Sequence, residues 1–241
     1  MKYRMNLSYD GTLYSGWAVQ PNSTSIQELI QKALQTVLRK ETPIVGSGRT
    51  DAGVHAKLQV AHFSYSKPID LSSLRYSLNG ILPRDIRVHE ILPVEDDFHA
   101  RFSVKKKIYH YHLSTAQDPF TYRYSHYIHS PLDLDLLNKS LPHLIGTHDF
   151  SAFASSHCGS KNPVKTLYRL EAIPQNGGFR LEYEGNGFLY KMVRNITGTL
   201  IEIATHKRPV EELPKILASK DRKQAGQTAP PHALFLYRVE Y

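Results

Sequence analysis

The stretch Gly48–His55 reads Gly-Arg-Thr-Asp-Ala-Gly-Val-His and is the most informative part of this 241-residue chain. It places one carboxylate, that of Asp51, between two glycines in a segment too small and polar to be core. Glycine permits backbone conformations closed to larger residues, so the turn can bring Asp51 close to a ligand. Arg49 can keep that carboxylate ionised, as nucleophilic or general-base chemistry requires. Aspartate and glycine are also the commonest turn residues, so local chemistry alone leaves a plain surface turn open.

Patterns around this loop predict a mixed α+β unit rather than a helical bundle. Residues 3–9 alternate like a strand, and Gln59–Tyr65 and Ile86–Leu92 are expected to be strands as well. A helix is predicted from Ser25 because the apolar residues that follow recur at i, i+3 and i+4. A shorter helix is predicted over residues 71–80.

The second half of the chain echoes this order. Strands are predicted at Tyr109–Ser114, 150–154, 165–173, 178–185 and Leu234–Tyr241, and helices at Asp133–Ile145, 188–204 and after Pro209. We therefore predict two similar α/β subdomains, residues 1–104 and 105–241, packed on one extended sheet with a cleft between them. No internal repeat is strong enough to prove duplication.

Charge favours a polyanionic partner. The net charge is +8 and the pI is about 9.4. Residues 1–104 hold 12 basic and 10 acidic side chains, whereas residues 105–241 hold 18 and 12. Basic residues there, including Lys161, are interleaved with several of the 15 tyrosines, a combination suited to phosphates and unstacked bases. A solvated basic surface is the alternative explanation.

Several classes of protein are disfavoured by composition. No apolar run is long enough for a transmembrane helix, and the N-terminus lacks the apolar core of a signal peptide, so the cytoplasm is expected. Cys158 is the only cysteine, which excludes an intrachain disulfide and a cysteine metal cage. The 13 histidines show no recognised metal-ligand spacing, so we expect neither a metal nor another cofactor.

Further motifs stand in order along the chain. They are Tyr9-Asp10-Gly11-Thr12 with Tyr14 and Gly16-Trp17, Phe98-His99-Ala100-Arg101-Phe102-Ser103, Lys107-Ile108-Tyr109-His110-Tyr111, Met192-Val193-Arg194-Asn195-Ile196-Thr197-Gly198 and Ala233-Leu234-Phe235-Leu236. Together with the Asp51 stretch, they resemble the motifs of the tRNA pseudouridine synthase A family. Because they span residues 9 to 236, a shared turn does not explain the match.

The resemblance implies a fold, an activity and a partner. The implied fold has two α/β subdomains, a mixed and mostly antiparallel sheet, and a central basic cleft. The implied activity is isomerisation of uridine to pseudouridine at positions 38, 39 and 40 of the anticodon arm of tRNA. The resemblance also implies a homodimer that holds one tRNA across both subunits.

The resemblance also assigns roles to individual residues. Asp51 is the implied nucleophile, and Tyr109 is the flat partner on which the flipped uracil stacks. Arg194 matches a basic residue held against the catalytic aspartate, where a permanent charge keeps the carboxylate ionised. Without the motifs, Tyr109 would be an ordinary strand tyrosine and Arg194 a surface charge on a helix.

Other positions have less defined implied roles. Leu234 or Leu236 forms the apolar wall of the pocket, and the sequence does not decide which. Arg49 orients the loop or helps to open the RNA stem, and Arg101 contacts a phosphate or positions a loop. Asp10 is expected to form a turn by capping backbone amides, and Trp17 to pack the first subdomain.

Two other classes of protein are alternatives to this interpretation. A non-catalytic RNA-binding or RNA-folding module would keep the basic cleft but would tolerate loss of Asp51. A glycoside or nucleoside hydrolase would need a second carboxylate as the acid, and none is evident near the motif. The sequence favours the pseudouridine synthase.

Overall fold

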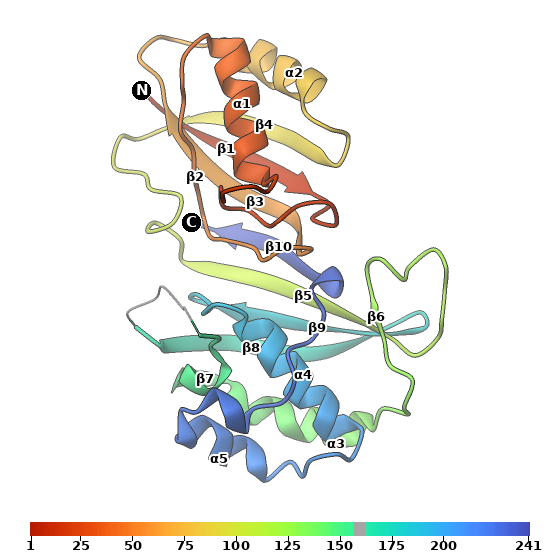
Figure 1. Cartoon of the computed structure of the whole chain (residues 1–241). Coiled ribbons are helices and arrows are strands. Elements are labelled where there is room, and N and C mark those ends of the chain that lie inside the picture. Colours follow the sequence, from red (N-terminus) through yellow and green to blue (C-terminus); the bar gives the residue numbers. More distant parts are fainter. Residues whose placement is uncertain (157–161) are drawn as a thin grey trace. The chain divides into compact units, whose positions relative to one another are not determined.

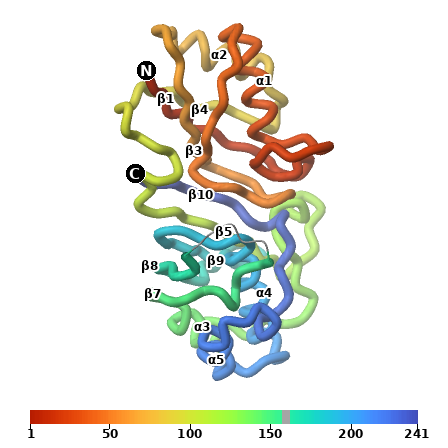
Figure 2. The backbone as a smooth tube through the Cα atoms, turned by 60° about the vertical axis from the view of Figure 1, so that its left-hand side comes forward, coloured from red at the N-terminus to blue at the C-terminus, as the bar shows by residue number. Residues whose placement is uncertain are grey.

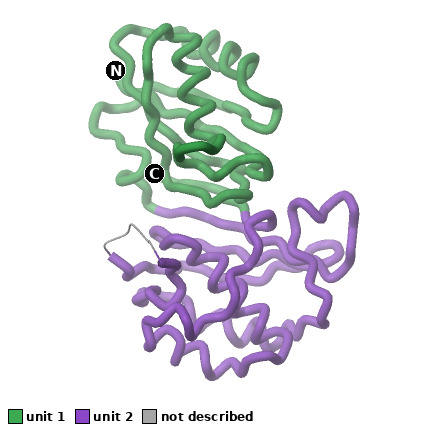
Figure 3. Tube along the Cα trace, viewed as in Figure 1, with its two compact units in different colours: residues 1–105, 235–241 green, residues 106–234 purple. Residues whose placement is uncertain are grey.

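The computed structural model describes residues 1–156 and 162–241, so Cys158 and Lys161 lie outside the described residues. The described chain forms two compact units (Figure 3). Unit 1 comprises residues 1–105 and 235–241, and unit 2 comprises residues 106–234. Each unit has its own strands and its own helices.

Unit 1 is a sheet covered by two helices. Its elements are β1 (Lys2–Tyr9), α1 (Ile26–Leu38), β2 (Val45–Gly46), β3 (His55–Ser64), α2 (Leu71–Ile81), β4 (Ile86–Val94) and β10 (Leu234–Glu240). The strand order is β4-β1-β3-β10, in which β1 is antiparallel to both neighbours and β10 runs parallel to β3. Figures 1 and 2 show α1 and α2 on the same face of this sheet.

The core of unit 1 includes the inward-facing side chains of β1, which alternate along the strand, and the apolar side chains of α1. Met5 and Leu7 of β1 are fully buried, as are Ile30 and Leu34 of α1. Each such side chain contributes roughly 1.5–3 kcal/mol to folding. The hydroxyl of Ser25 accepts a hydrogen bond from the backbone of the first turn, which confirms the predicted start of this helix.

Unit 2 is an antiparallel sheet with helices packed against it. Its elements are β5 (Lys106–Ser114), β6 (His126–Tyr127), α3 (Leu134–Ser140), β7 (Gly146–Asp149), β8 (Val164–Gln175), β9 (Gly178–Gly185), α4 (Met192–Ala204) and α5 (Glu212–Ser219). The strand order is β5-β9-β8-β7, and β6 pairs with β5 in parallel. Gly177, with a φ of +74°, turns the chain between β8 and β9. The pair Gly177-Gly178, next to strand-like runs, is a sequence signal for such a hairpin turn.

The predicted α+β class and the mostly antiparallel pairing are confirmed, whereas the central basic cleft stays a prediction. The strand predicted at 150–154 is wrong, because Ser151–Phe153 forms a 3₁₀ turn. The Asp149 carboxylate accepts hydrogen bonds from the backbone and the hydroxyl of Ser151, which turns the chain there. Strand β7 precedes that turn and was missed.

Two predicted helices are shorter in the structure. The helix predicted over Asp133–Ile145 ends at Ser140 and continues as a 3₁₀ turn, because Pro142 has no N–H to extend it. The helix predicted over 188–204 begins at Met192, since Lys191 before it adopts a left-handed conformation with φ of +59°.

The C-terminal strand also departs from the predicted division of the chain. We assigned all of residues 105–241 to the second subdomain, whereas residues 235–241 belong to unit 1. The physical reason is the pairing of β10 with β3, in which Phe235 lies opposite His55. Pairing between strands far apart in sequence cannot be read from local periodicity.

His62 is a buried titratable group in unit 1. It lies on β3, and its Nδ1 accepts a hydrogen bond from the N–H of Ala100 at 3.1 Å. Burial lowers the pKa of His62 to about 4, and the neighbouring charges of His99 and Lys2 act in the same direction. The folded protein therefore keeps this imidazole neutral at pH 7.

We predict that the free energy of unfolding decreases as the pH falls from about 6.5 to about 4, because the unfolded chain binds a proton that folded His62 does not. The loss from this group is on the order of 2 kcal/mol at pH 5, and it vanishes above the unfolded pKa. Urea unfolding of wild type and His62→Asn at pH 7 and pH 5 measures it. Asparagine keeps an acceptor for Ala100 and cannot titrate, so the variant should lose less stability; equal losses would exclude His62 as the source.

Candidate active site

The loop between β2 and β3 carries Asp51, and its first half is fixed to β3. The backbone N–H of Ser47 donates to the carbonyl of Val60 at 2.7 Å, and its hydroxyl donates to Gln59 Oε1 at 2.6 Å. Gln59 is fully buried, and its Nε2 donates to the carbonyl of Gly48 at 3.0 Å. A buried amide side chain thus holds the start of the loop in one conformation.

A tight turn begins at Asp51 in the second half of the loop. The N–H of Val54 donates to the carbonyl of Asp51 at 3.1 Å, and Gly53 has a φ of +76°. Asp51 is half-buried, whereas Arg49 and Ala52 are exposed. The glycine conformation expected from the motif is present, and the loop presents Arg49 at the surface. A role for Arg49 toward Asp51 or RNA stays a prediction.

The segment Tyr9–Trp17 lies directly against this loop. The N–H of Trp17 donates to the carbonyl of Thr50 at 3.1 Å, and the hydroxyls of Tyr9 and Thr50 are 2.8 Å apart. A Cβ at Gly16, where φ is +92°, would lie 2.4 Å from the Thr50 carbonyl oxygen. The two motifs, about 35 residues apart in sequence, therefore form one packed structure in which the glycine permits backbone contact.

Asp10 and His55 connect the same turn to the end of the loop. Asp10 Oδ1 accepts hydrogen bonds from the backbone and hydroxyl of Thr12, which confirms the predicted capping role of Asp10. His55 is 1% exposed, and its Nδ1 lies 2.9 Å from Asp10 Oδ1 and accepts from the N–H of Gly11 at 3.0 Å. The imidazole stacks on Phe235 with ring centroids 4.6 Å apart, so β10 packs against the residue at which the loop ends.

Trp17 and Arg101 occupy different environments in unit 1. Trp17 is 2% exposed and packs against Gly46, which confirms its predicted place in the core. Arg101 is exposed, with its guanidinium carbon 5.6 Å from the ring centroid of Phe102. The preceding residue, Ala100, is held by hydrogen bonds from its N–H to His62 and from the hydroxyl of Tyr241 to its carbonyl. Arg101 therefore sits on a fixed surface segment, and its contact with phosphate stays a prediction.

In unit 2, Tyr109 lies in the middle of β5. It is 8% exposed and pairs in register with Tyr183 of β9. Its ring meets that of Phe188 edge-on, with centroids 5.0 Å apart. Packing of this kind fixes the plane of an aromatic ring, which a stacking partner for a base requires.

Arg194 lies in the first turn of α4 and is bound to the segment that leads toward β10. Its Nε donates to the carbonyl of Ala229 at 2.8 Å, and the N–H of Ala229 donates to the carbonyl of Arg194 at 3.1 Å. The hydroxyl of Tyr111 donates to the carbonyl of Pro230 at 2.9 Å. Helix α4 and β5 together therefore position residues 229–230 and hold the Arg194 side chain against them.

Sequence reasoning missed the polar residues of α4 that hold this segment. Asn195 is fully buried; its Oδ1 accepts from the hydroxyl of Thr228 at 2.7 Å, and its Nδ2 donates to the carbonyl of Phe153. Thr199 accepts from the N–H of Gly226 at 2.8 Å. Asn195 and Thr199 are four residues apart and so share a face of the helix. That face lies away from the predicted apolar stripe, so the sequence carries little signal that these side chains are buried and hold another segment.

Leu234 and Leu236 are two residues apart at the start of β10 and so share a face of the strand. They are 5% and 1% exposed, respectively. Phe235 between them points to the opposite face, where it stacks on His55. Burial does not distinguish the two leucines, so which of them lines a pocket stays a prediction.

Comparison with known proteins decides the family. The sequence matches the family described as tRNA pseudouridine synthase over residues 6–103 and 141–241. It is 54% identical to tRNA pseudouridine synthase A 1 of Protochlamydia amoebophila over 99% of this chain and 96% of that protein. It is 42% identical to tRNA pseudouridine synthase A of Bacillus pumilus over 100% of this chain and 99% of that protein. The chain belongs to the tRNA pseudouridine synthase family.

This membership confirms the resemblance drawn from the motifs. The relatives cover the chain almost from end to end; the tRNA pseudouridine synthase A of Chlamydia muridarum, for example, is 42% identical over 100% of this chain and 92% of its own. Each motif of the tRNA pseudouridine synthase family falls on a structured segment described above. The structure places Asp51, Arg49, Arg101 and Leu236 in unit 1, and Tyr109, Arg194 and Leu234 in unit 2.

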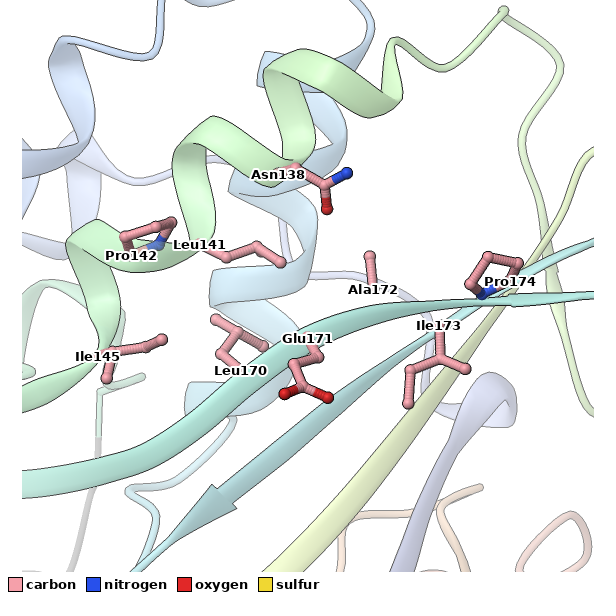
Figure 4. Close-up of a pocket in the computed structure, with 9 residues that line it drawn as sticks. All are labelled: Asn138, Leu141, Pro142, Ile145, Leu170, Glu171, Ala172, Ile173 and Pro174. Carbon is pink, nitrogen blue, oxygen red and sulfur yellow. The ribbon is translucent and has the colours of Figure 1, made fainter.

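A surface depression in unit 2 is separate from these residues. It has a volume of about 300 Å³ and lies between β8 and the helical segment formed by α3 and the 3₁₀ turn that follows (Figure 4). Its lining is mostly apolar and consists of Asn138, Leu141, Pro142, Ile145, Leu170, Glu171, Ala172, Ile173 and Pro174. None of the predicted site residues lines it.

The described residues contain neither a metal-binding cluster nor a membrane-spanning helix. Among residues 1–156 and 162–241, no cluster of three or more His, Cys, Asp or Glu side chains is arranged to hold a metal ion. In the same part of the chain, every helix is too short or too polar to span a bilayer.

We predict that Gly198→Ala lowers the free energy of unfolding by several kcal/mol, because its Cβ would lie 1.7 Å from the carbonyl oxygen of Gln227. Gly80→Ala is the matched control, since Gly80 lies in α2 with nothing within 4 Å of an added Cβ. The control should gain about 0.5–1 kcal/mol from helix propensity. Chemical unfolding of both variants measures the difference, and a neutral Gly198→Ala would contradict the close packing of residues 226–229 on α4.

Proposed function

We propose that the protein isomerises uridine to pseudouridine in the anticodon stem-loop of tRNAs, at positions 38, 39 and 40, with Asp51 as the nucleophile. Membership of the tRNA pseudouridine synthase family supports the reaction and its substrate class. The observation that carries the assignment to Asp51 is the construction of its loop. Buried Gln59 holds one side of the loop, and the backbone of Gly16 supports the other.

The reaction breaks the glycosidic bond between C1′ and N1 of uridine, rotates the base, and joins C1′ to C5. It involves no net redox change and needs no energy input. An ionised carboxylate on a rigid turn supplies a positioned nucleophile, and fixed geometry removes much of the entropic cost of attack. Asp51 can act in this scheme by attacking either the base or C1′. The uridine must leave its stack before it reacts, which costs a few kcal/mol in a helix and less near a loop.

Tyr109 is proposed to stack on the flipped uracil. Support comes from the burial of its ring and from the edge-on contact with Phe188, which restrict the plane of the ring. A flat face in a defined orientation keeps the freed base from diffusing away between bond breakage and rejoining. Stacking of a base on an aromatic ring is worth about 1–3 kcal/mol.

Arg194 is proposed to supply the permanent positive charge that keeps the catalytic carboxylate ionised. Support comes from the hydrogen bond between its Nε and Ala229, which limits the freedom of the guanidinium. Arg49 is proposed to orient the loop or open the RNA stem, and Arg101 to contact phosphate; both are exposed. Leu234 or Leu236 is proposed to form the apolar wall.

The partner proposed for the protein is tRNA, and the net charge of +8 suits this polyanion. We further propose a homodimer that holds one tRNA across both subunits, and a cytoplasmic location. These follow from the resemblance and are tested by sedimentation and by fractionation.

We predict that Asp51→Asn lowers pseudouridine formation by several orders of magnitude while leaving RNA affinity nearly unchanged, because it removes the nucleophile and keeps the shape of the side chain. Pseudouridine mapping on an unmodified anticodon stem-loop measures turnover, and a binding titration measures affinity. Asp70→Asn is the control, since Asp70 caps α2 and asparagine caps a helix equally well.

The outcomes distinguish a pseudouridine synthase from a non-catalytic RNA-binding or RNA-folding module. Conversion at stem-loop uridines by wild type and by Asp70→Asn, but not by Asp51→Asn, supports the enzyme and its nucleophile together. Tight RNA binding with no conversion by wild type would instead favour an RNA-binding or RNA-folding module. Equal turnover by Asp51→Asn would remove the nucleophile assignment.

We predict that Tyr109→Phe keeps most of the activity, whereas Tyr109→Ala loses about tenfold or more, because phenylalanine retains the stacking face and alanine does not. Single-turnover kinetics on the same stem-loop measures both variants. Circular dichroism of the purified proteins is needed alongside, since Tyr109 is largely buried. If Tyr109→Phe were the more damaging change, the hydroxyl rather than the ring face would be the functional group.

A further inference from the structure

The connection between β5 and β6 carries three exposed aromatic side chains within five residues. Phe120 is 88% exposed, Tyr122 is 58% exposed and Tyr124 is 40% exposed. In Figures 1 and 3 this loop extends well beyond the strands of unit 2 from which it emerges. Exposed apolar patches are uncommon on proteins that have no binding partner for them, whereas single exposed residues need no explanation. The grouping of the three rings therefore points to a ligand.

The loop is folded rather than extended. The Asp118 carboxylate accepts hydrogen bonds from the N–H of Phe120 at 2.9 Å and from the hydroxyl of Thr121 at 3.0 Å. The N–H of Tyr122 donates to the carbonyl of Asp118, and the N–H of Tyr124 donates to that of Thr121 at 2.8 Å. Two successive turns thus present the rings in a defined arrangement, which reduces the entropy lost when a ligand binds.

Arg123 adds a positive charge beside one of these rings. Its Nε donates to the hydroxyl of Tyr122 at 2.8 Å, and its guanidinium carbon lies 5.5 Å from the centre of that ring. The guanidinium is planar and always charged, and it binds phosphate with well-defined geometry. Aromatic faces together with an arginine are the groups that proteins use to bind unpaired nucleotides.

The base of the loop is fixed to the strand that carries Tyr109. Strand β6 pairs with the end of β5, and the N–H of Thr115 donates to the carbonyl of Gly177 at 3.0 Å. Ser114 follows Tyr109 by five residues on β5, a separation of roughly 17 Å along a strand. Stacked nucleotides are about 3.4 Å apart, so this distance corresponds to roughly five nucleotides.

We propose that residues 118–124 form an RNA-docking surface on which an unpaired base of the tRNA stacks while Arg123 faces the phosphate backbone. The identity of the RNA rests on the proposed function. Because residues 118–124 lie beyond Ser114, the surface meets the RNA at a nucleotide other than the uridine that stacks on Tyr109. A protein partner would use similar residue types, but the net charge of +8 and the guanidinium of Arg123 beside the Tyr122 ring favour nucleic acid.

The test uses the full-length protein and an unmodified tRNA transcript, and it measures the dissociation constant by titration. Phe120→Ala should raise this constant about tenfold, in line with the loss of one base–aromatic stack. Phe120→Trp keeps a flat ring and should restore the wild-type value. Tyr76→Ala is the matched control, because Tyr76 is 83% exposed on α2 of unit 1 and should leave affinity unchanged.

A second arm identifies the chemical group on the RNA. Transcripts with a single abasic site at successive anticodon-loop positions keep the phosphate backbone and remove one base. At one position the abasic change should weaken binding to wild type about tenfold and have no further effect on Phe120→Ala. Equal losses for both proteins at every position would overturn the stacking contact.

The remaining outcomes overturn the proposal or separate it from the proposed function. Unchanged affinity of Phe120→Ala, or an equal loss for Tyr76→Ala, would overturn it. Sedimentation velocity that shows Phe120→Ala converting a dimer into monomers would assign the surface to a second copy of the chain and overturn an RNA surface. Because affinity and not turnover is measured, a wild-type protein that binds RNA through Phe120 but forms no pseudouridine would refute the proposed function alone.

Discussion

Close backbone contact at glycines is the constraint on which the Asp51 loop depends. A Cβ at Gly11 would lie 2.0 Å from the carbonyl oxygen of Val54, and one at Gly16 would lie 2.4 Å from that of Thr50. No side chain can occupy those spaces, so the turn after β1 rests directly on the backbone around Asp51. A loop supported in this way is held by the fold and does not depend on ligand for its conformation, which suits a group that must be in position before reaction.

Unit 2 uses the same physical device for a different segment. Gly198 allows α4 to contact the backbone of residue 227, and buried Asn195 and Thr199 satisfy the polar groups of the chain that crosses the helix. This segment leads into β10, whose pairing with β3 places Phe235 under His55. The path of the C-terminal chain is therefore fixed by hydrogen bonds and by steric fit rather than by an apolar stripe of its own.

The residues proposed to function fall into two groups, those held in packed structure and those exposed at the surface. The loop around Asp51 and the strand around Tyr109 are embedded in packed structure, whereas Arg49, Arg101 and Phe120 are at the surface. Rigid groups can position a single reacting nucleotide, and exposed groups can contact a large flexible RNA without disturbing that geometry. Such a division is consistent with the proposed chemistry, in which the uridine changes its bonding while the rest of the tRNA stays bound.

Local sequence determined the elements with a strong period or a clear cap, such as α1 after Ser25, the hairpin turn at Gly177 and the turn made by Asp10, because each depends on residues within a few positions of one another. The motifs also identified the family, since matched residues spread along the whole chain. The tertiary structure alone decided that β10 returns to unit 1 and that the motif around Gly16 supports the loop around Asp51. Those outcomes depend on contacts between residues distant in sequence, for which periodicity and propensity carry no information.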